Sequence, residues 1–353
     1  MREVAVVAFA QSDHVRDSSE VSEAEMLMPV LHDVLEQTGL KARDIGFICS
    51  GSSDYLAGRA FSFTMALDGV GAWPPVAESH VETDGAWALY EAWVHLLTGD
   101  ADTALVYAYG KSSPGALREV LTRQLDPYYL APLWPDSVAL AALQARALID
   151  AGVTDERAMA AVAAGARAAA DGNPHAHLRG EVPMGEYVVH PLRTGDCPPV
   201  DDGAAAVVLA AGDTARRLAR RHSRRPAWIR GMDHRIEAHS LGVRDLTDSP
   251  STRLAARNAG AFQRPVDTAE LHAPFTSQQV LLRRALELEE DVTVNPSGGA
   301  LAANPVMAAG LIRLGEAAAR VQRGASDRAL AHATSGPCLQ QNLVAVLEGE
   351  EGE

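Results

Sequence analysis

The stretch CPPVDDGAAAVVLAAGD, residues 197–213, determines how the rest of the chain is interpreted. Eight small or aliphatic residues follow one another without a polar interruption, from Ala204 to Ala211. A short continuous apolar run of this kind predicts a β-strand. The Asp-Gly and Gly-Asp pairs at its two ends predict turns.

Working outward from this strand, short apolar runs alternate with segments of helical periodicity. The segment 21–38 is predicted to be a helix, because Ser22 can cap its start and Gly39 follows its end. A second helix is predicted over 84–98. Further strands are predicted at 4–10, 45–51, 103–110, 227–234 and 342–349. This alternation is typical of parallel β-α-β units, so the predicted fold class is α/β.

Residues 111–190 interrupt the alternation. They contain DPYYLAPLWPD (126–136), two alanine-rich helical segments and DGNPHAHLRG (171–180). Long excursions of this kind often cover a site. We therefore predict two α/β halves of similar plan, residues 1–214 and 226–353, with an insertion at about 111–190 in the first.

Three segments resemble, in order, the motifs of thiolases. CPPVDDGAAAVVLA (197–210) is similar to the DGAAA strand that closes the first half of those proteins, and LHAPF (271–275) to their HDCF or HEAF motif. VNPSGGALAANPVMAAG (294–310) is similar to their NxxGGAxAxGHPxGxxG segment. CSGSSDYLAGRAFSF, ESHVETDGAWALYEAW and LAHATSGPCLQQNLV resemble the thiolase-like lipid-transfer proteins, or sterol-carrier-protein-type thiolases, of actinobacterial sterol side-chain degradation. The resemblance implies the thiolase fold, with a layered α-β-α-β-α core.

The same resemblance shows that the usual nucleophile is missing. A thiolase carries its acyl group on a cysteine at a helix N-terminus, where the helix dipole favours the thiolate. The resemblance puts that position at Glu82, Thr83 or Asp84, depending on the register. No cysteine lies between residues 50 and 196.

The partners of that nucleophile are changed as well. Asn304 stands where the GHP motif has its histidine, and the late catalytic cysteine is expected near 334–336. Cys338 lies on the wrong side of Gly336-Pro337 for that role. Cleavage through an acyl-cysteine is therefore not expected.

HVETDGAWALYEA (80–92) places three ionisable groups where a strand passes into a helix. Asp84 is a candidate base, although Asp84 or Thr83 could simply cap the helix. On this basis, Asp84→Asn is expected to remove a base and keep the cap. His80 and Glu82 alternate along an extended segment and so face the same side. Glu82 is a second catalytic candidate or a surface charge, and His80 a substrate-binding candidate.

The remaining candidates come from the resembling motifs. His272 is a catalytic candidate or a structural histidine between apolar neighbours. Asn304 could donate to an oxyanion, or could be a turn residue constrained by the following proline. Gly298 and Gly299 allow close approach of the backbone, either for packing or for a thioester oxygen. Tyr55 could line the mouth of a pocket or contact another subunit. We expect Asp84, His272 and Asn304 to converge on one pocket.

Composition excludes several classes of protein. The net charge of −15 argues against a nucleic-acid partner. The chain has no 18-residue apolar run and no signal-peptide pattern at its start, so we expect a cytoplasmic protein without a membrane span. Cys49, Cys197 and Cys338 are widely spaced, which argues against disulfides and a zinc site. We expect no metal and no tightly bound cofactor.

Two functions remain open. One is an enzyme that cleaves a carbon–carbon bond of an acyl-CoA by a retro-aldol reaction, with a CoA thioester of a sterol or other lipid side chain as substrate. This needs a base, oxyanion donors and an acid, but no acyl-cysteine. The other is a non-catalytic subunit that completes the dimer and pocket of a thiolase-like partner. For either, the resemblance implies a homo- or heterodimer with a thiolase-like chain, and a zinc-ribbon/OB-fold protein as a further partner.

Overall fold

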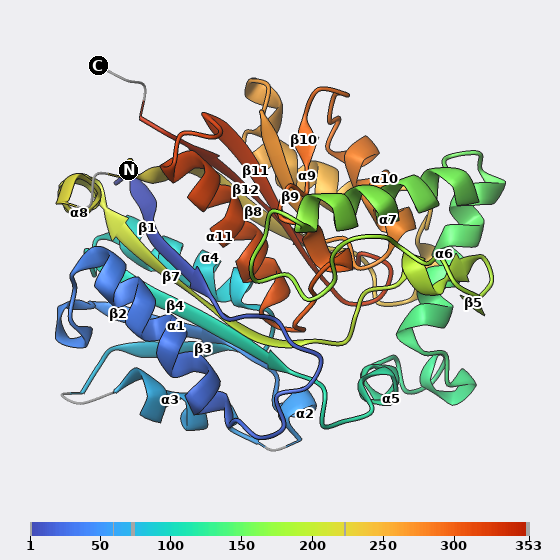
Figure 1. Ribbon diagram of the computed structural model, residues 1–353, viewed down its shortest axis with the longest axis horizontal. Helices are drawn as coiled ribbons and strands as arrows, with labels where there is room; N and C mark the ends of the chain where they lie inside the picture. Colours follow the sequence, from blue (N-terminus) through green and yellow to red (C-terminus); the bar gives the residue numbers. More distant parts are fainter. Residues whose placement is uncertain (1, 59, 72–74, 222–223, 351–353) are drawn as a thin grey trace.

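The fold is built on one continuous ladder of ten strands (Figure 1). The computed structural model describes residues 2–58, 60–71, 75–221 and 224–350. In these residues the strand order is β10-β9-β11-β12-β8-β1-β7-β4-β2-β3. The strands are β1 (Val4–Gln11), β2 (Phe47–Gly51), β3 (Glu78–Val81), β4 (Thr103–Lys111), β7 (Asp202–Ala211), β8 (Ala227–Ile236), β9 (Thr268–Leu271), β10 (Thr293–Val294), β11 (Arg328–Ser335) and β12 (Gln341–Glu348).

The ladder consists of two five-stranded halves with the same plan. In the first half, β3, β2 and β4 are parallel to one another, and β7 and β1 follow antiparallel. In the second, β10, β9 and β11 are parallel, and β12 and β8 follow antiparallel. Only two residue pairs, Ala5 with Trp228 and Val6 with Ala227, join β1 to β8. The predicted repeat of two α/β halves is thus present in strand order and direction.

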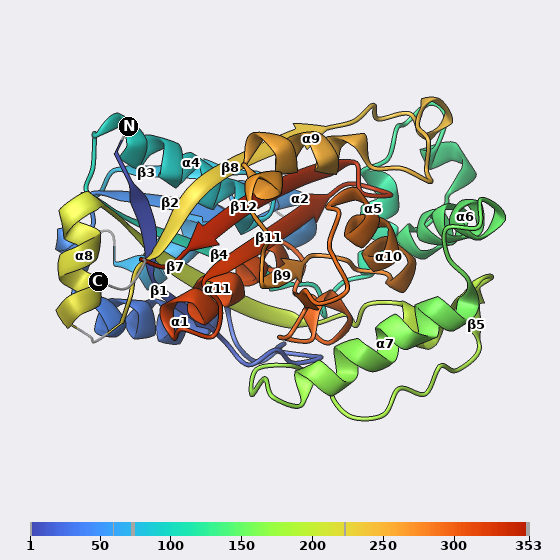
Figure 2. The ribbon, with the colours of Figure 1, turned by 90° about the horizontal axis from the view of Figure 1, so that it is seen from above.

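Two helices, α4 (Gly85–Thr98) and α11 (Ala309–Gln322), form the middle layer between the two half-sheets (Figure 1). Seen from above, they appear on the two sides of β12 (Figure 2). Twelve of the fourteen residues of α11 are buried, as expected for a helix covered on all sides. Small and aliphatic side chains of both helices share one core with the inner faces of both sheet halves. This middle layer brings the N-termini of α4 and α11 together.

Further helices cover the outer faces. Helix α1 (Glu23–Thr38) packs on the first half beside α3 (Phe63–Val70), and α9 (Pro250–Asn258) and α10 (Thr276–Ala285) lie on the second. The predicted start of α1 is confirmed, because Ser22 and Glu25 form a reciprocal capping box. The short α2 (Asp54–Ala57) and α8 (Gly212–Arg221) complete this side. The α-β-α-β-α layering predicted from the resemblance is confirmed.

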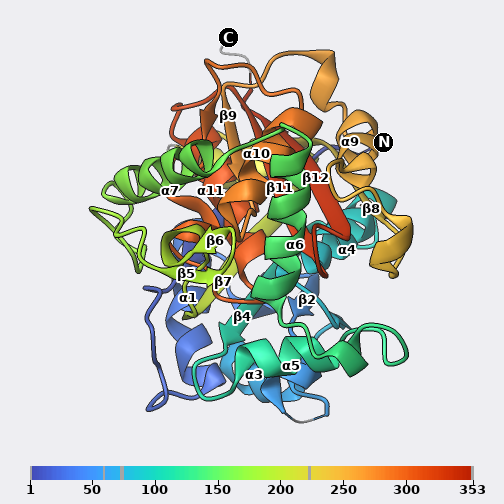
Figure 3. The same ribbon diagram turned by 90° about the vertical axis from the view of Figure 1, so that its right-hand side faces the viewer.

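The segment 111–190 leaves the layered core after β4, and its helices are spread over the side of the molecule that faces the viewer in Figure 3. It contains α5 (Leu117–Arg123) and the two predicted alanine-rich helices, α6 (Ser137–Asp150) and α7 (Glu156–Ala170). A small hairpin, β5 (Tyr187–Val189) and β6 (Leu192–Arg193), leads back toward β7. Helices α6 and α7 pack against α10, so the insertion leans on the second half of the sheet.

Candidate active site

His272 and Asn304 are in direct contact at the end of the second half-sheet. His272 directly follows β9, and Asn304 lies in the turn that precedes α11. The Nε2 atom of His272 lies 3.2 Å from Oδ1 of Asn304. The backbone N–H of Thr334 points at Nδ1 of His272 over 3.4 Å. Both residues are buried.

These contacts fix the tautomer of His272 and the orientation of Asn304. Because Nδ1 accepts from a backbone N–H, the proton of a neutral imidazole resides on Nε2 and is donated to Asn304. Burial lowers the pKa of His272 to about 3, helped by the charge of nearby His332 and Arg313, so the ring is neutral at physiological pH. With both nitrogens occupied, His272 positions Asn304. The amide nitrogen of Asn304 has no hydrogen-bond partner among the described residues and remains a donor.

The backbone of Asn304 is held by a second pair of ionisable residues. Its N–H donates to Oδ2 of Asp201 over 2.8 Å, and the other carboxylate oxygen contacts Nδ1 of His177. Asp201 is completely buried, whereas the side chain of His177 keeps 23% exposure. Burial raises the pKa of Asp201, against the hydrogen bonds from Asn304 and His177. Sequence reasoning missed both residues, although DGNPHAHLRG and VDDGA contain them.

Asp84 is the N-cap of α4, as the capping interpretation predicted, and it also caps α11. Its Oδ1 accepts from the backbone N–H groups of Ala86 at 2.8 Å and Leu311 at 3.1 Å. Its Oδ2 accepts from the N–H of Gly310 at 2.9 Å. Complete burial raises the pKa of Asp84 to about 6, against the opposing effect of these three donors. Both oxygens are turned toward helix ends, so the carboxylate joins the two middle helices.

His80 and Glu82 lie on the same side of the strand, as predicted. Nε2 of His80 is 3.5 Å from Oε2 of Glu82, and its Nδ1 is 3.1 Å from the hydroxyl of Ser50. The ring of His80 stacks on Phe63 at a centroid distance of 4.6 Å. Glu82 also accepts from the backbone N–H of Asp54 over 2.7 Å, which ties it to the start of α2. Both side chains therefore have structural contacts of their own in the first half.

Thr83 lies between Glu82 and the N-cap residue Asp84. The hydroxyl oxygen of Thr83 is buried and has no hydrogen-bond partner among the described residues. Thr83 is one of the three positions where the resemblance places the missing nucleophile.

Gly298 and Gly299 are required by the backbone and by packing. Both have positive φ angles, 95° and 63°. A Cβ atom at Gly298 would lie 2.7 Å from the Cβ of Ala170 on α7, and one at Gly299 would lie 2.7 Å from the amide of Asn295. Of the two uses expected for this pair, the packing use accounts for these contacts.

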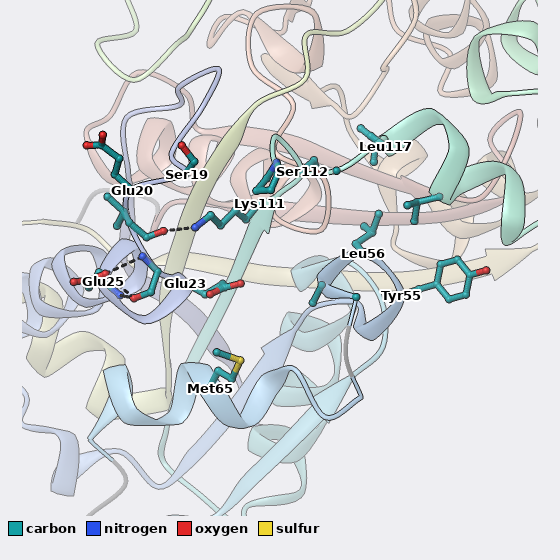
Figure 4. Close-up of a pocket in the computed structure, with 17 residues that line it drawn as sticks. Ser19, Glu20, Glu23, Glu25, Tyr55, Leu56, Met65, Lys111, Ser112 and Leu117 are labelled. Carbon is teal, nitrogen blue, oxygen red and sulfur yellow. Dashed lines mark hydrogen bonds between the residues drawn. The ribbon is translucent and has the colours of Figure 1, made fainter.

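Tyr55 lines a pocket in the first half of the molecule. The pocket has a volume of about 750 Å³ and lies between the start of α1, helix α2 and the end of β4. Tyr55 and Glu25 stand at opposite ends of it in Figure 4, and Lys111 donates to the carbonyl of Val21 across it. His272, Asn304 and Asp84 are not among its lining residues. Of the three residues expected to converge on one pocket, His272 and Asn304 are in direct contact, and Asp84 contacts the start of α11.

The cysteines are packed as structural residues. Cys338 is buried beside Leu140 and Leu241, and burial raises the pKa of its thiol to about 11. Burial also raises the pKa of Cys49 and of Cys197 to about 12. Thr334 and Ser335, at the end of β11, occupy the stretch where the late cysteine was expected. Among the described residues, no group of three or more His, Cys, Asp or Glu side chains is arranged to hold a metal ion.

A further buried ionic cluster lies behind this site. Arg313, in the middle of α11, donates to Glu270 over 3.0 Å, and Ser297 donates to the same carboxylate over 2.6 Å. Arg313 and Glu270 are almost completely buried. The cluster connects β9, α11 and the turn that carries Gly298, so it holds together the elements that present His272 and Asn304.

Comparison with known proteins finds distant relatives of the chain. No known family profile matches the chain. The sequence is 25% identical over 371 residues to the acetyl-CoA acetyltransferase of Methanothermobacter thermautotrophicus, covering 95% of each chain. It is 23% identical over 357 residues to the acetyl-CoA acetyltransferase of Methanocaldococcus jannaschii, covering 90% of this chain and 89% of that one. It is also 25% identical over 232 residues to a benzoylsuccinyl-CoA thiolase subunit of Thauera aromatica, covering 56% of this chain and 59% of the subunit.

Solved structures agree on the fold. The Ltp2-ChsH2(DUF35) aldolase superposes with a TM-score of 0.81 at 18% identity, covering 99% of this chain and 98% of that chain. Human mitochondrial 3-ketoacyl-CoA thiolase superposes with a TM-score of 0.77 at 14% identity, covering 99% of both chains. The chain has the thiolase fold. Within the part that the structure describes, every helix is too short or too polar to span a bilayer.

Proposed function

We propose that the chain takes part in the retro-aldol cleavage of a CoA thioester in lipid or sterol side-chain degradation, within a heteromeric complex. The observation that carries this proposal is the Asn304 amide. His272 holds its oxygen, and its nitrogen remains a hydrogen-bond donor in a buried turn. A donor held in this way suits the developing charge of a thioester enolate.

The changed nucleophile position favours the same reaction over thiolysis. Where a thiolase would carry an acyl group, this chain has Thr83 and the doubly capping Asp84. A retro-aldol cleavage needs no covalent acyl group: the Cα–Cβ bond of a β-hydroxyacyl-CoA breaks, and a carbonyl compound and a shortened acyl-CoA leave. The superposition on an aldolase, and the likeness to acetyl-CoA acetyltransferases, are in keeping with this substrate class.

The alternative is a non-catalytic subunit that completes a partner's pocket. It is favoured by the occupied carboxylate of Asp84 and by the large pocket being lined by residues other than His272 and Asn304. The partners expected under both proposals are a second thiolase-like chain and a zinc-ribbon/OB-fold protein. The Ltp2-ChsH2(DUF35) aldolase carries two components in its name, which supports a heteromeric assembly here.

The experiment compares the chain alone, its co-purified partners alone and the mixture, with 3-hydroxy-3-methylbutanoyl-CoA as a probe that would release acetone and acetyl-CoA. The informative variant is Asn304→Asp, because it keeps an oxygen for His272 Nε2–H and removes the N–H donor. We expect a 100- to 1000-fold loss of rate, the usual cost of one oxyanion donor. A mixture that cleaves the probe at the same rate with Asn304→Asp would assign the chemistry to the partner and the scaffold role to this chain.

A further inference from the structure

His177 is an imidazole whose ring is oriented by a buried carboxylate. Its Nδ1 contacts Oδ1 of Asp201, and the second oxygen of Asp201 is occupied by the Asn304 N–H at 2.8 Å. A carboxylate that accepts on both oxygens leaves the proton of the shared contact on Nδ1. The neutral His177 ring then presents Nε2 as a free lone pair, the arrangement that a general base requires.

Availability separates His177 from His272 and His14, and burial of its carboxylate partner separates it from His175, whose Nδ1 contacts the exposed Asp13. Both nitrogens of His272 are occupied. Nε2 of His14 faces Gln11 at 3.0 Å, and its Nδ1 abuts Gly203, where a Cβ atom would lie only 2.2 Å away. Among the described residues, Nε2 of His177 has no hydrogen-bond partner, and its side chain keeps 23% exposure.

The position of His177 relative to Asn304 is fixed through two contacts. Asp201 spans the distance between the imidazole and the Asn304 backbone with a single carboxyl group. The N–H of Leu178 donates to the carbonyl of Ala302 over 2.9 Å, so the segment that carries His177 runs beside the turn before Asn304. Base and oxyanion donor are thereby supplied from two segments that are hydrogen-bonded to each other.

We propose that His177 is the general acid–base residue of the site and that Asp201 is its positioning residue. This inference rests on the proposed function. Nε2 of His177 removes the proton of the β-hydroxyl group while the Cα–Cβ bond breaks. The electron pair of that bond passes into the thioester enolate, which Asn304 stabilises, and the hydroxyl carbon becomes a carbonyl. The imidazolium then returns the same proton to Cα, so protons and electrons balance without a further reactant.

The charged groups around His177 suit an imidazolium intermediate. Asp201 contacts it directly, and Asp202 stands next to Asp201 at the start of β7. On the same loop, His175 is paired with Asp13 at 2.9 Å, and the guanidinium of Arg179 donates to the backbone carbonyls of Ala176 and Pro174. The negative charge of Asp201 therefore stabilises the protonated ring where it forms.

The first test needs no substrate. Long-range ¹H–¹⁵N spectra of the whole protein, with His177→Gln to assign the signal, are expected to show the Nδ1–H tautomer of His177. Asp201→Asn is expected to shift that equilibrium, because an amide can donate to Nδ1. An Nε2–H tautomer in the wild-type protein would overturn the assignment.

The second test uses the complex and 3-hydroxy-3-methylbutanoyl-CoA. His177→Gln is expected to lower kcat by 100- to 10,000-fold with little change in KM, the usual contribution of a general base. The acidic limb of the pH–kcat profile is expected to vanish in His177→Gln and to move in Asp201→Asn. His175→Gln, on the same loop, is the matched control and is expected to behave like wild type.

The outcomes distinguish this inference from the function beneath it. If the wild-type complex cleaves the probe and His177→Gln keeps its kcat and pH profile, the role of His177 is wrong and the proposed function stands. If Asn304→Asp is without effect in an active complex, the chemistry lies in the partner and both proposals fall.

Discussion

The double cap at Asp84 makes a quantitative prediction about stability. Asp84→Asn keeps one carbonyl oxygen, which can still accept from the N–H groups of Ala86 and Leu311. The new NH₂ group then faces the N–H of Gly310, which now donates to Oδ2 over 2.9 Å. A donor is thus placed against a donor in a fully buried position.

The cost follows from the hydrogen bond that the substitution removes. A hydrogen bond to a charged group contributes roughly 1.5–3 kcal/mol, and an unpaired buried N–H costs roughly 1–3 kcal/mol. Because these terms overlap, and because the neutral amide no longer carries the burial cost that raises the pKa of Asp84, we expect Asp84→Asn to lower the free energy of unfolding by about 1 kcal/mol. The expectation that asparagine would retain the whole cap considered α4 alone, so the variant does not separate capping from catalysis as simply as the sequence suggested.

The matched control is Asp155, an exposed N-cap. Its Oδ1 accepts from the N–H of Ala158, over 2.7 Å, at the start of α7. Asparagine caps such a helix about as well as aspartate, so Asp155→Asn should change stability by a few tenths of a kcal/mol. Urea unfolding at pH 8, above the pKa of Asp84, measures both variants. Equal, small effects for Asp84→Asn and Asp155→Asn would refute the bridging role of the carboxylate.

Three further predictions concern acid stability, covalent chemistry and assembly. Burial lowers the pKa of His272 and His14 to about 3 and that of His332 to about 4, so the unfolded chain binds protons first below pH 6.5. Each ring should therefore cost about 2 kcal/mol of stability at pH 5 relative to neutral pH, and denaturant midpoints that stay level from pH 7 to 5 would contradict this. Incubation with acetoacetyl-CoA and free CoA should give no acyl-enzyme by mass spectrometry, and an adduct on Cys338 with turnover would overturn that expectation. The edge strand β3 should pair with another thiolase-like chain or a second copy; Glu78→Pro, which removes an outward N–H, should weaken the dimer by light scattering, and a monomeric wild-type protein at micromolar concentration would count against it.

Local sequence patterns predicted the elements because each element is specified by nearby residues. The buried run at 202–211 and the capping box at Ser22 needed only periodicity and a cap residue. The N-cap of α4 at Asp84 was readable for the same reason. The second cap was not, because Gly310 and Leu311 lie 226 and 227 residues away and meet Asp84 only through the middle layer.

The candidate site also combines residues that the sequence indicates with contacts that the sequence does not indicate. Motif resemblance pointed to His272 and Asn304, which are in contact. The orientation of the Asn304 amide also depends on Thr334 of β11, because the backbone N–H of Thr334 fixes the tautomer of His272. The His177–Asp201 pair joins two loops that carry no periodic pattern, so its signal in the sequence was only the presence of both residue types.

The two helix ends of the middle layer are joined by a carboxylate at the position where the resemblance places a nucleophile. In a thiolase the positive end of the first middle helix favours a cysteine thiolate. Here the N-terminal ends of α4 and α11 share the carboxylate of Asp84. Gly310 packs so closely against this carboxylate that a Cβ atom there would lie 2.5 Å from Asp84. The helix-end potential that would activate a nucleophile is therefore used to hold the two halves of the molecule together. On our proposal, the donor and the base then come from the neighbouring turn, from Asn304 and His177, where Asp201 connects them. A reaction without a covalent intermediate would still be possible with the two helix ends occupied by Asp84.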